Sequence, residues 1–246
     1  MQLAPASCIF FIKRNLSKMK RIIIFLALCS LQGVALAQWA VGVHGGISGT
    51  SITRSHTDRI DETYGSLFGY DFGIEGRYSV NTWLAVRADL DLMQRNHRLQ
   101  RHLNYISPVY TDHLNTYFTL PLMADFSFGG QRLRGHMLLG GFCGFWLSQR
   151  VKGVTYGMTD YDVFFNDFDE QRPFTREERR FNAGLLGGFG LSYGLNENID
   201  LNIEALYFYD LVSHHVGYSH LQDYRYLNTC TLTFGVTYKL SKTEKQ

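Results

Sequence analysis

The chain has 246 residues, of which 24 are glycine and only four are proline, and 45% of them are hydrophobic. This composition excludes a disordered or linker-rich protein and allows either one β-barrel or two small domains. The net charge of +2 does not indicate a nucleic-acid ligand, because five basic and no acidic residues lie in the first 37 positions. The remainder carries 19 Lys and Arg against 22 Asp and Glu.

Residues 1–37 have the parts of a secretory signal peptide. Basic residues between positions 13 and 21 precede the apolar run Ile22 to Leu28, and Ala35-Leu36-Ala37 places small residues where a signal peptidase reads them. We therefore expect cleavage before Gln38 and an exported mature protein. Met19 opens a complete signal peptide by itself and is an alternative start.

Eight later segments alternate apolar and polar residues with a period of two, which is typical of β-strands with two different faces. The clearest is the pair of segments from Phe181 to Leu211, where apolar residues hold the odd positions after 198 and mostly polar residues hold the even ones. Pro121 lacks a backbone donor, so we expect a bulge or local break at that position. The eight segments are residues 39–48, 66–80, 84–92, 113–128, 133–148, 181–193, 199–211 and 229–240.

The connections between these segments alternate in length. Short turns fall near residues 80, 130 and 196, whereas long connections cover the ranges 49–65, 97–112, 149–178 and 212–226. An even strand count with short turns at one end is typical of an outer-membrane barrel with periplasmic termini and extracellular loops. The sequence thus predicts an all-β protein, an eight-stranded antiparallel up-and-down transmembrane β-barrel over residues 38–240, followed by a short tail at 241–246.

A soluble eight-stranded barrel would show the same alternation turned inside out. Two features favour the membrane. The polar face is rich in glycine, arginine and carboxylates but holds almost no lysine, and large aromatics lie near both strand ends on the apolar face, as at the two surfaces of a lipid layer. The expected surroundings are therefore outer-membrane lipid and lipopolysaccharide. The aromatics are Trp39, Tyr78, Phe128, Tyr193 and Tyr238 toward the short turns, and Tyr70, Phe145, Phe181 and Tyr209 toward the loops.

Four stretches carry a resemblance to a known family: Tyr117-Phe118-Thr119-Leu120-Pro121-Leu122, Gly140-Gly141-Phe142, Gly187-Gly188-Phe189-Gly190 with Leu195-Asn196, and Tyr238-Lys239-Leu240. From Trp39 to Leu240 the sequence resembles the PorT-like outer-membrane β-barrel proteins of Gram-negative bacteria. The resemblance implies insertion by the barrel assembly machinery and, through the family's name, a link to protein secretion. It implies no activity and no cofactor. Many outer-membrane barrels end on an aromatic residue, whereas six residues follow Leu240 here, so Phe234 or Tyr238 would have to serve in assembly.

The inward face predicts a filled lumen without an open pore, because eight strands enclose a space just wide enough for side chains. Unpaired buried charges are costly, so the inward charges should form ion pairs across the strands. A proton or ion path is the alternative. The expected network consists of Asp71, Glu75, Arg77, Arg87, Asp89, Asp91, Asp125, Arg134, His136, Asp200 and Glu204, with Lys239 on the same face.

The connection 149–178 combines aromatic and charged residues, which suits a protein contact. Its contact candidates are Tyr161, Phe164, Phe165, Phe168 and Arg172. In the alternative interpretation these aromatics fold back over the barrel mouth. Several histidines lie in the loops without a recurring ligand spacing, so we expect no metal and no cofactor.

The sequence therefore predicts a non-enzymatic structural or interaction component that acts through its long loops or, as the family resemblance implies, an accessory to protein secretion. One alternative is a loop-end lipid or peptide hydrolase using Asp210, Ser213, His214, His215 and Asp223. A narrow transporter of small ligands is the other.

Overall fold

The computed structural model describes residues 38–54, 62–101, 109–130, 132–158, 163–176, 178–213 and 225–240. The predicted signal peptide and C-terminal tail lie outside these ranges. Within them there is no helix of the length and hydropathy needed to cross a membrane. The strands are β1 (Gln38–Arg54), β2 (Glu62–Ser79), β3 (Leu84–Gln94), β4 (His97–Arg101), β5 (Val109–Gly129), β6 (Leu133–Met158), β7 (Val163–Gln171), β8 (Phe181–Gly194), β9 (Ile199–Asp210) and β10 (Arg225–Lys239).

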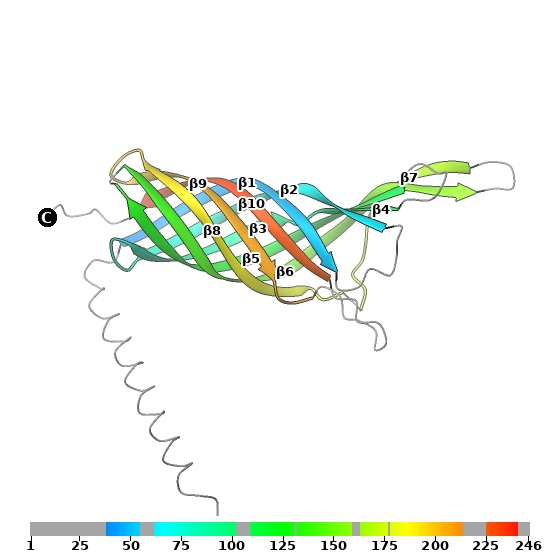
Figure 1. The fold of residues 1–246 in the computed structure, drawn as a ribbon, viewed down its shortest axis with the longest axis horizontal. Helices are drawn as coiled ribbons and strands as arrows, with labels where there is room; N and C mark the ends of the chain where they lie inside the picture. The colour runs from blue at the N-terminus through cyan, green and yellow to red at the C-terminus, as the bar shows by residue number, and fades with distance from the viewer. Residues whose placement is uncertain are drawn as a thin grey trace, which may run out of the picture.

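Eight of these strands close into a barrel (Figure 1). Each pairs antiparallel with its neighbours in the order β1, β2, β3, β5, β6, β8, β9, β10, and β10 returns to pair with β1. A closed sheet leaves no unpaired edge inside a membrane. The predicted eight-stranded up-and-down barrel is confirmed.

Two further strands lie at the loop end. β4 follows β3 and pairs with β2 and β5, while β7 pairs with residues 150–158 of β6. The β6–β7 hairpin extends well beyond the barrel (Figure 1). Most of the long connection predicted over 149–178 is therefore a regular β-hairpin. Apolar and charged residues occur on both faces of β7, so its sequence lacks the alternation that identified the barrel strands.

The ladder around Pro121 is interrupted, but its register does not shift there. The pairing between β3 and β5 stops after Ala88 with Leu122 and resumes at Asp91 with Thr119. Pro121 lies in this gap and has no N–H to donate. The bulge lies instead between Thr116 and Tyr117, in the β5–β6 pair. The predicted local break is present, and the bulge is four residues earlier.

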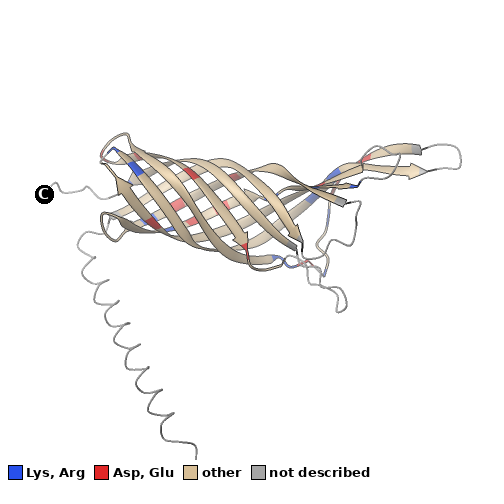
Figure 2. Ribbon diagram, in the orientation of Figure 1, with Lys and Arg blue, Asp and Glu red and all other residues tan. Residues whose placement is uncertain are grey.

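The apolar face points outward. In β9 the side chains of Leu201 and Ile203 are 41% and 46% exposed, while Asp200 and Glu204 are buried. Most charged residues of the eight barrel strands are consequently buried inside the barrel. Figure 2 shows where charged residues lie along the barrel strands and on the hairpin. This arrangement is that of a barrel surrounded by lipid. Exposed aromatics lie toward both ends, among them Trp39, Phe128, Tyr193, Tyr238, Phe145, Phe181 and Tyr209.

The lumen contains an apolar layer in addition to its charged residues. Phe142 and Phe208 meet edge to face there, with ring centroids 5.2 Å apart. The layer consists of Met93, Met123, Leu138, Phe142, Leu186, Leu206 and Phe208, all nearly inaccessible to solvent. Close packing of this kind leaves no room for a continuous column of water.

Candidate functional site

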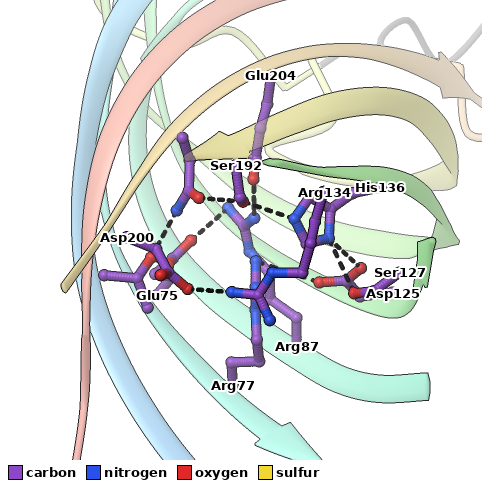
Figure 3. Close-up of polar contacts among 12 residues, drawn as sticks. Glu75, Arg77, Arg87, Asp125, Ser127, Arg134, His136, Ser192, Asp200 and Glu204 are labelled. Carbon is purple, nitrogen blue, oxygen red and sulfur yellow. Dashed lines mark hydrogen bonds and ion pairs between the residues drawn. The ribbon is translucent and has the colours of Figure 1, made fainter. Parts of the chain in front are cut away.

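Arg87 lies at the centre of the charged lumen (Figure 3). Its guanidinium donates to Glu204 at 2.6 Å and to Asp89 at 2.9 Å, and its Nη2 lies 2.9 Å from Glu75. These carboxylates come from β9, β3 and β2, so one side chain joins strands from different parts of the barrel. Glu75 also accepts a hydrogen bond from the hydroxyl of Thr237 on β10. The guanidinium fork meets several carboxylates at once, which is the geometry that favours Arg over Lys.

A second group of contacts surrounds His136 (Figure 3). Its Nδ1 lies 2.9 Å from Asp125 and its Nε2 lies 2.5 Å from the hydroxyl of Ser192. Ser192 donates to Asn202, which links this group to β9. Arg77 approaches the second oxygen of Asp125 at 3.1 Å. The histidine is thus held in a structural network by direct partners on two other strands, β5 and β8.

Asp200 anchors the turn end of the lumen. It accepts from Arg134 at 2.5 Å and from Lys239 at 2.9 Å, and these three side chains line a hollow of about 60 Å³. Both cations are partly exposed, in contrast to Arg87. Solvent therefore reaches this end of the lumen but stops short of the apolar layer.

Arg95 and Asp210 form an ion pair that the sequence analysis did not assign to the lumen. Arg95 donates to Asp210 at 2.8 Å, and both side chains are fully buried. The guanidinium carbon also lies between 5.1 and 5.7 Å from the ring centroids of Tyr117, Phe142 and Phe208. Cation–π contacts of this kind stabilise a desolvated arginine. Continued alternation from Arg87 through position 95 would have identified this residue.

Asp71 and Asp91 depart from the expected pairing with arginines. Asp91 lies 3.2 Å from His44, an inward residue of β1 that was not among the predicted network residues. Asp71 is 1% exposed, and its Oδ1 has no hydrogen-bond partner among the described residues.

The hairpin candidates lie in different surroundings. Phe164 and Phe165 are 43% and 48% exposed, Phe168 is half-buried, and Arg172 lies 4.0 Å from Glu178. Tyr161 falls outside the described residues. These two exposed phenylalanines lie on the hairpin, whereas a later aromatic, Phe174, packs edge to face with Trp146.

One exposed ion pair joins the two strands of the hairpin. Arg150 donates to the carboxylate of Asp169 at 2.6 and 2.8 Å. This bidentate hydrogen bond holds the pKa of Asp169 below its ordinary value and raises the pKa of Arg150.

The residues considered for a hydrolase are only partly described. Asp210 accepts a hydrogen bond from Arg95 and is buried, and Ser213 follows it by three residues. The other three candidates, His214, His215 and Asp223, lie outside the described ranges.

Comparison with known proteins places this architecture in context. A family model for the outer membrane protein beta-barrel domain matches residues 31–211. No curated protein sequence matches the chain. Among solved structures, the chain is similar to the outer membrane protein OprG from Pseudomonas aeruginosa, with 14% identity, coverage of 82% of this chain and 95% of that one, and a TM-score of 0.48. Neisserial surface protein A is 17% identical, with coverage of 83% of this chain and 99% of that one and a TM-score of 0.44. The Ail protein of Yersinia pestis is 16% identical, with coverage of 82% of this chain and 99% of that one and a TM-score of 0.40.

Proposed function

Because this chain belongs to the family of outer membrane protein β-barrel domains, we propose that it acts in the bacterial outer membrane through a protein contact at its loop end. In this proposal the termini are periplasmic and the long connections extracellular. Lipid and lipopolysaccharide surround the exposed apolar face, and the barrel assembly machinery inserts the chain. The resemblance to PorT-like proteins makes protein secretion the process that such a contact would serve.

The lumen supports a role without conduction. A permeating ligand would have to pass the triple contact of Arg87 and then the layer around Phe208, both of which are almost inaccessible to solvent. Separating buried ion pairs and opening a packed apolar layer are each costly. The small-ligand transporter is therefore the less favoured alternative.

The hydrolase alternative also lacks a favourable observation. Asp210, its candidate base nearest to the barrel, already accepts a hydrogen bond from the buried Arg95 at 2.8 Å. A carboxylate held in that way is poorly placed to take a proton from a nucleophile at the surface.

The observation that carries the proposal is the projecting β6–β7 hairpin. The ring of Phe164 lies over Gly157 on β6, where a Cβ atom would come within 2.4 Å of it, so part of that ring covers the hairpin's own backbone. Phe165 lies on the other face, opposite Tyr156 and on the same side as Asp167. Aromatic residues are enriched in binding interfaces, and the acidic group beside Phe165 would favour a partner that offers an apolar pocket and basic residues.

The contact can be tested by site-specific crosslinking in intact cells. A photo-crosslinking amino acid at Phe165 is expected to give a discrete adduct, whereas the same probe at Glu197, in a short turn at the opposite barrel end, should not give that adduct. Heat-dependent gel mobility would show that both proteins are folded. Absence of an adduct at Phe165 in a folded barrel would contradict the proposal.

The role in secretion needs a separate readout. Shortening the hairpin by removing residues 153–168 retains the β6–β8 ladder and all but two pairs of the β5–β6 ladder, and it should lower the amount of exported protein that reaches the medium. If export stayed normal while the Phe165 adduct persisted in the full-length protein, the contact would stand and its link to secretion would be wrong.

A further inference from the structure

Three side chains that commonly bind metals converge inside the barrel. His44 on β1 and Asp89 and Asp91 on β3 each present one ligand atom, and these atoms lie within 4.8 Å of one another. The side chains of His44 and Asp91 are 6% and 3% exposed. The group is separate from the hairpin and from the loop histidines.

A glycine makes this convergence possible. Gly73 on β2 lies between His44 and Asp91 in the strand register. A Cβ atom on Gly73 would come within 2.0 Å of Asp91 Oδ1 and 2.7 Å of His44 Nε2. The two ligand atoms therefore meet in the space that a side chain at position 73 would fill. Any other residue there would push them apart.

Two polar atoms around this space, His44 Nδ1 and Asp71 Oδ1, are buried without a hydrogen bond among the described residues. Asp91 Oδ1 lies 3.2 Å from His44 Nε2. Asp71 lies on the inward face of β2, two positions from Gly73, and is 1% exposed. Leaving buried polar groups unpaired is costly, so a cation between these side chains would stabilise the cluster.

The excess of carboxylates over permanent cations in the lumen also favours a bound cation. The described lumen buries eight carboxylates, those of Asp71, Glu75, Asp89, Asp91, Asp125, Asp200, Glu204 and Asp210. It contains five permanent cations, Arg77, Arg87, Arg95, Arg134 and Lys239. Arg87 already contacts three of the carboxylates, and Arg95 is bound to Asp210, so neither is free to neutralise Asp71 and Asp91.

We propose that His44, Asp89 and Asp91 bind a divalent transition-metal cation inside the barrel, with the carboxylate of Asp71 balancing its charge. One imidazole nitrogen together with carboxylate oxygens suits Zn²⁺ and its neighbours in the first transition series, whereas Ca²⁺ and Mg²⁺ prefer oxygen ligands throughout. The ion would tie β1 to β3 across β2. Asp89 would bind the metal while its carboxylate still accepts hydrogen bonds from Arg87. Those hydrogen bonds would fix the orientation of the ligand.

The first test measures metal content in the full-length barrel, purified in detergent with a tag that contains no histidine. After exposure to Zn²⁺ and removal of the free ion, the wild type should retain about one equivalent of zinc per barrel. Asp91→Asn keeps the shape of the side chain and should lose at least about nine-tenths of that zinc. Asp112→Asn is the matched control, since this buried carboxylate pairs with Arg98 away from the cluster, and it should retain the wild-type zinc content.

The second test does not depend on the folding of any variant. Zinc added to the chelator-treated wild type should raise its unfolding temperature, and excess chelator should reverse the increase.

Gly73→Ala retains all the proposed ligands but fills the space between them, so it should bind no zinc. A wild type that retains no zinc and shows no thermal shift would overturn the proposal. Equal zinc content in wild type and Asp91→Asn would overturn it as well, because the metal would then lie elsewhere on the chain.

Discussion

Replacement of Arg87 by methionine would test the ion-pair network at its centre. Methionine retains much of the length of arginine but has no charge and no donor. The substitution leaves Glu75, Asp89 and Glu204 without their shared cation, at sites where each carboxylate is almost fully buried. The protein must then either bury uncompensated charge or protonate these groups, and both cost folding free energy.

The expected magnitude follows from the number of contacts. Removing one partner of a single buried ion pair costs about 3–5 kcal/mol. Arg87 has three carboxylate partners, so we expect Arg87→Met to lower the free energy of unfolding by at least that amount. This is a large part of the roughly 5–15 kcal/mol that stabilises a typical folded domain.

The assay is reversible urea unfolding of the barrel in lipid vesicles, followed by tryptophan fluorescence and by heat-dependent gel mobility. Arg150→Met is the control, because Arg150 and Asp169 form a bidentate pair whose side chains are 63% and 46% exposed. Exposed pairs contribute little to stability, so no measurable change is expected in the control. A loss below about 1 kcal/mol for Arg87→Met would show that the three carboxylates do not depend on it, and would refute the network as the main electrostatic support of the lumen.

Two further predictions address the apolar layer and the hairpin. Phe208→Ala removes a fully buried ring beside Phe142 and should destabilise the barrel by about 3–5 kcal/mol in the same urea assay; a loss near zero would mean that the layer is not packed. Arg150 lowers the pKa of Asp169, so their pairing contributes stability to the hairpin above the ordinary Asp pKa and loses it as pH falls through the lowered value. A carbon-13 titration of the Asp169 carboxyl should therefore show a midpoint below the ordinary value, and Arg150→Gln should return it toward that value; identical midpoints would contradict the pairing.

The barrel could be predicted because its two faces differ so strongly. Residues 199–204 alternate between lipid-facing aliphatic and inward polar side chains, and such alternation determines strand, face and register together. The same rule fails where the lumen itself becomes apolar. Met93 and Phe208 point inward, so the sequence reads as apolar on both faces at these positions. For that reason Arg95, two residues beyond Met93, was not assigned to the lumen.

Contacts between strands that are far apart in the sequence could not be predicted either. The inward position of Glu204 was predictable, but its contact with Arg87 depends on side chains that meet across the barrel from 117 positions apart. In the sequence, His44 is a single histidine on the polar face of its strand. Its contact with Asp91 depends on the register of β1, β2 and β3, in which Gly73 pairs with both residues. The hairpin was missed for a local reason, since β7 carries aromatics on both faces and has no buried side.

The two proposals concern parts of the molecule that can be altered independently. The lumen side chains are largely engaged with one another, so they offer little free surface to a partner, and the hairpin with Phe165 is the described element that extends farthest from the barrel. A cation between β1 and β3 would instead act on the stability of the barrel that carries the hairpin. Phe165→Ala should therefore abolish the contact and leave zinc content unchanged, while Asp91→Asn should lose zinc and retain the contact for as long as the barrel stays folded. Loss of both properties in a folded single variant would show that the lumen and the hairpin are coupled, which the separate ladders of β1–β3 and β6–β7 give no reason to expect.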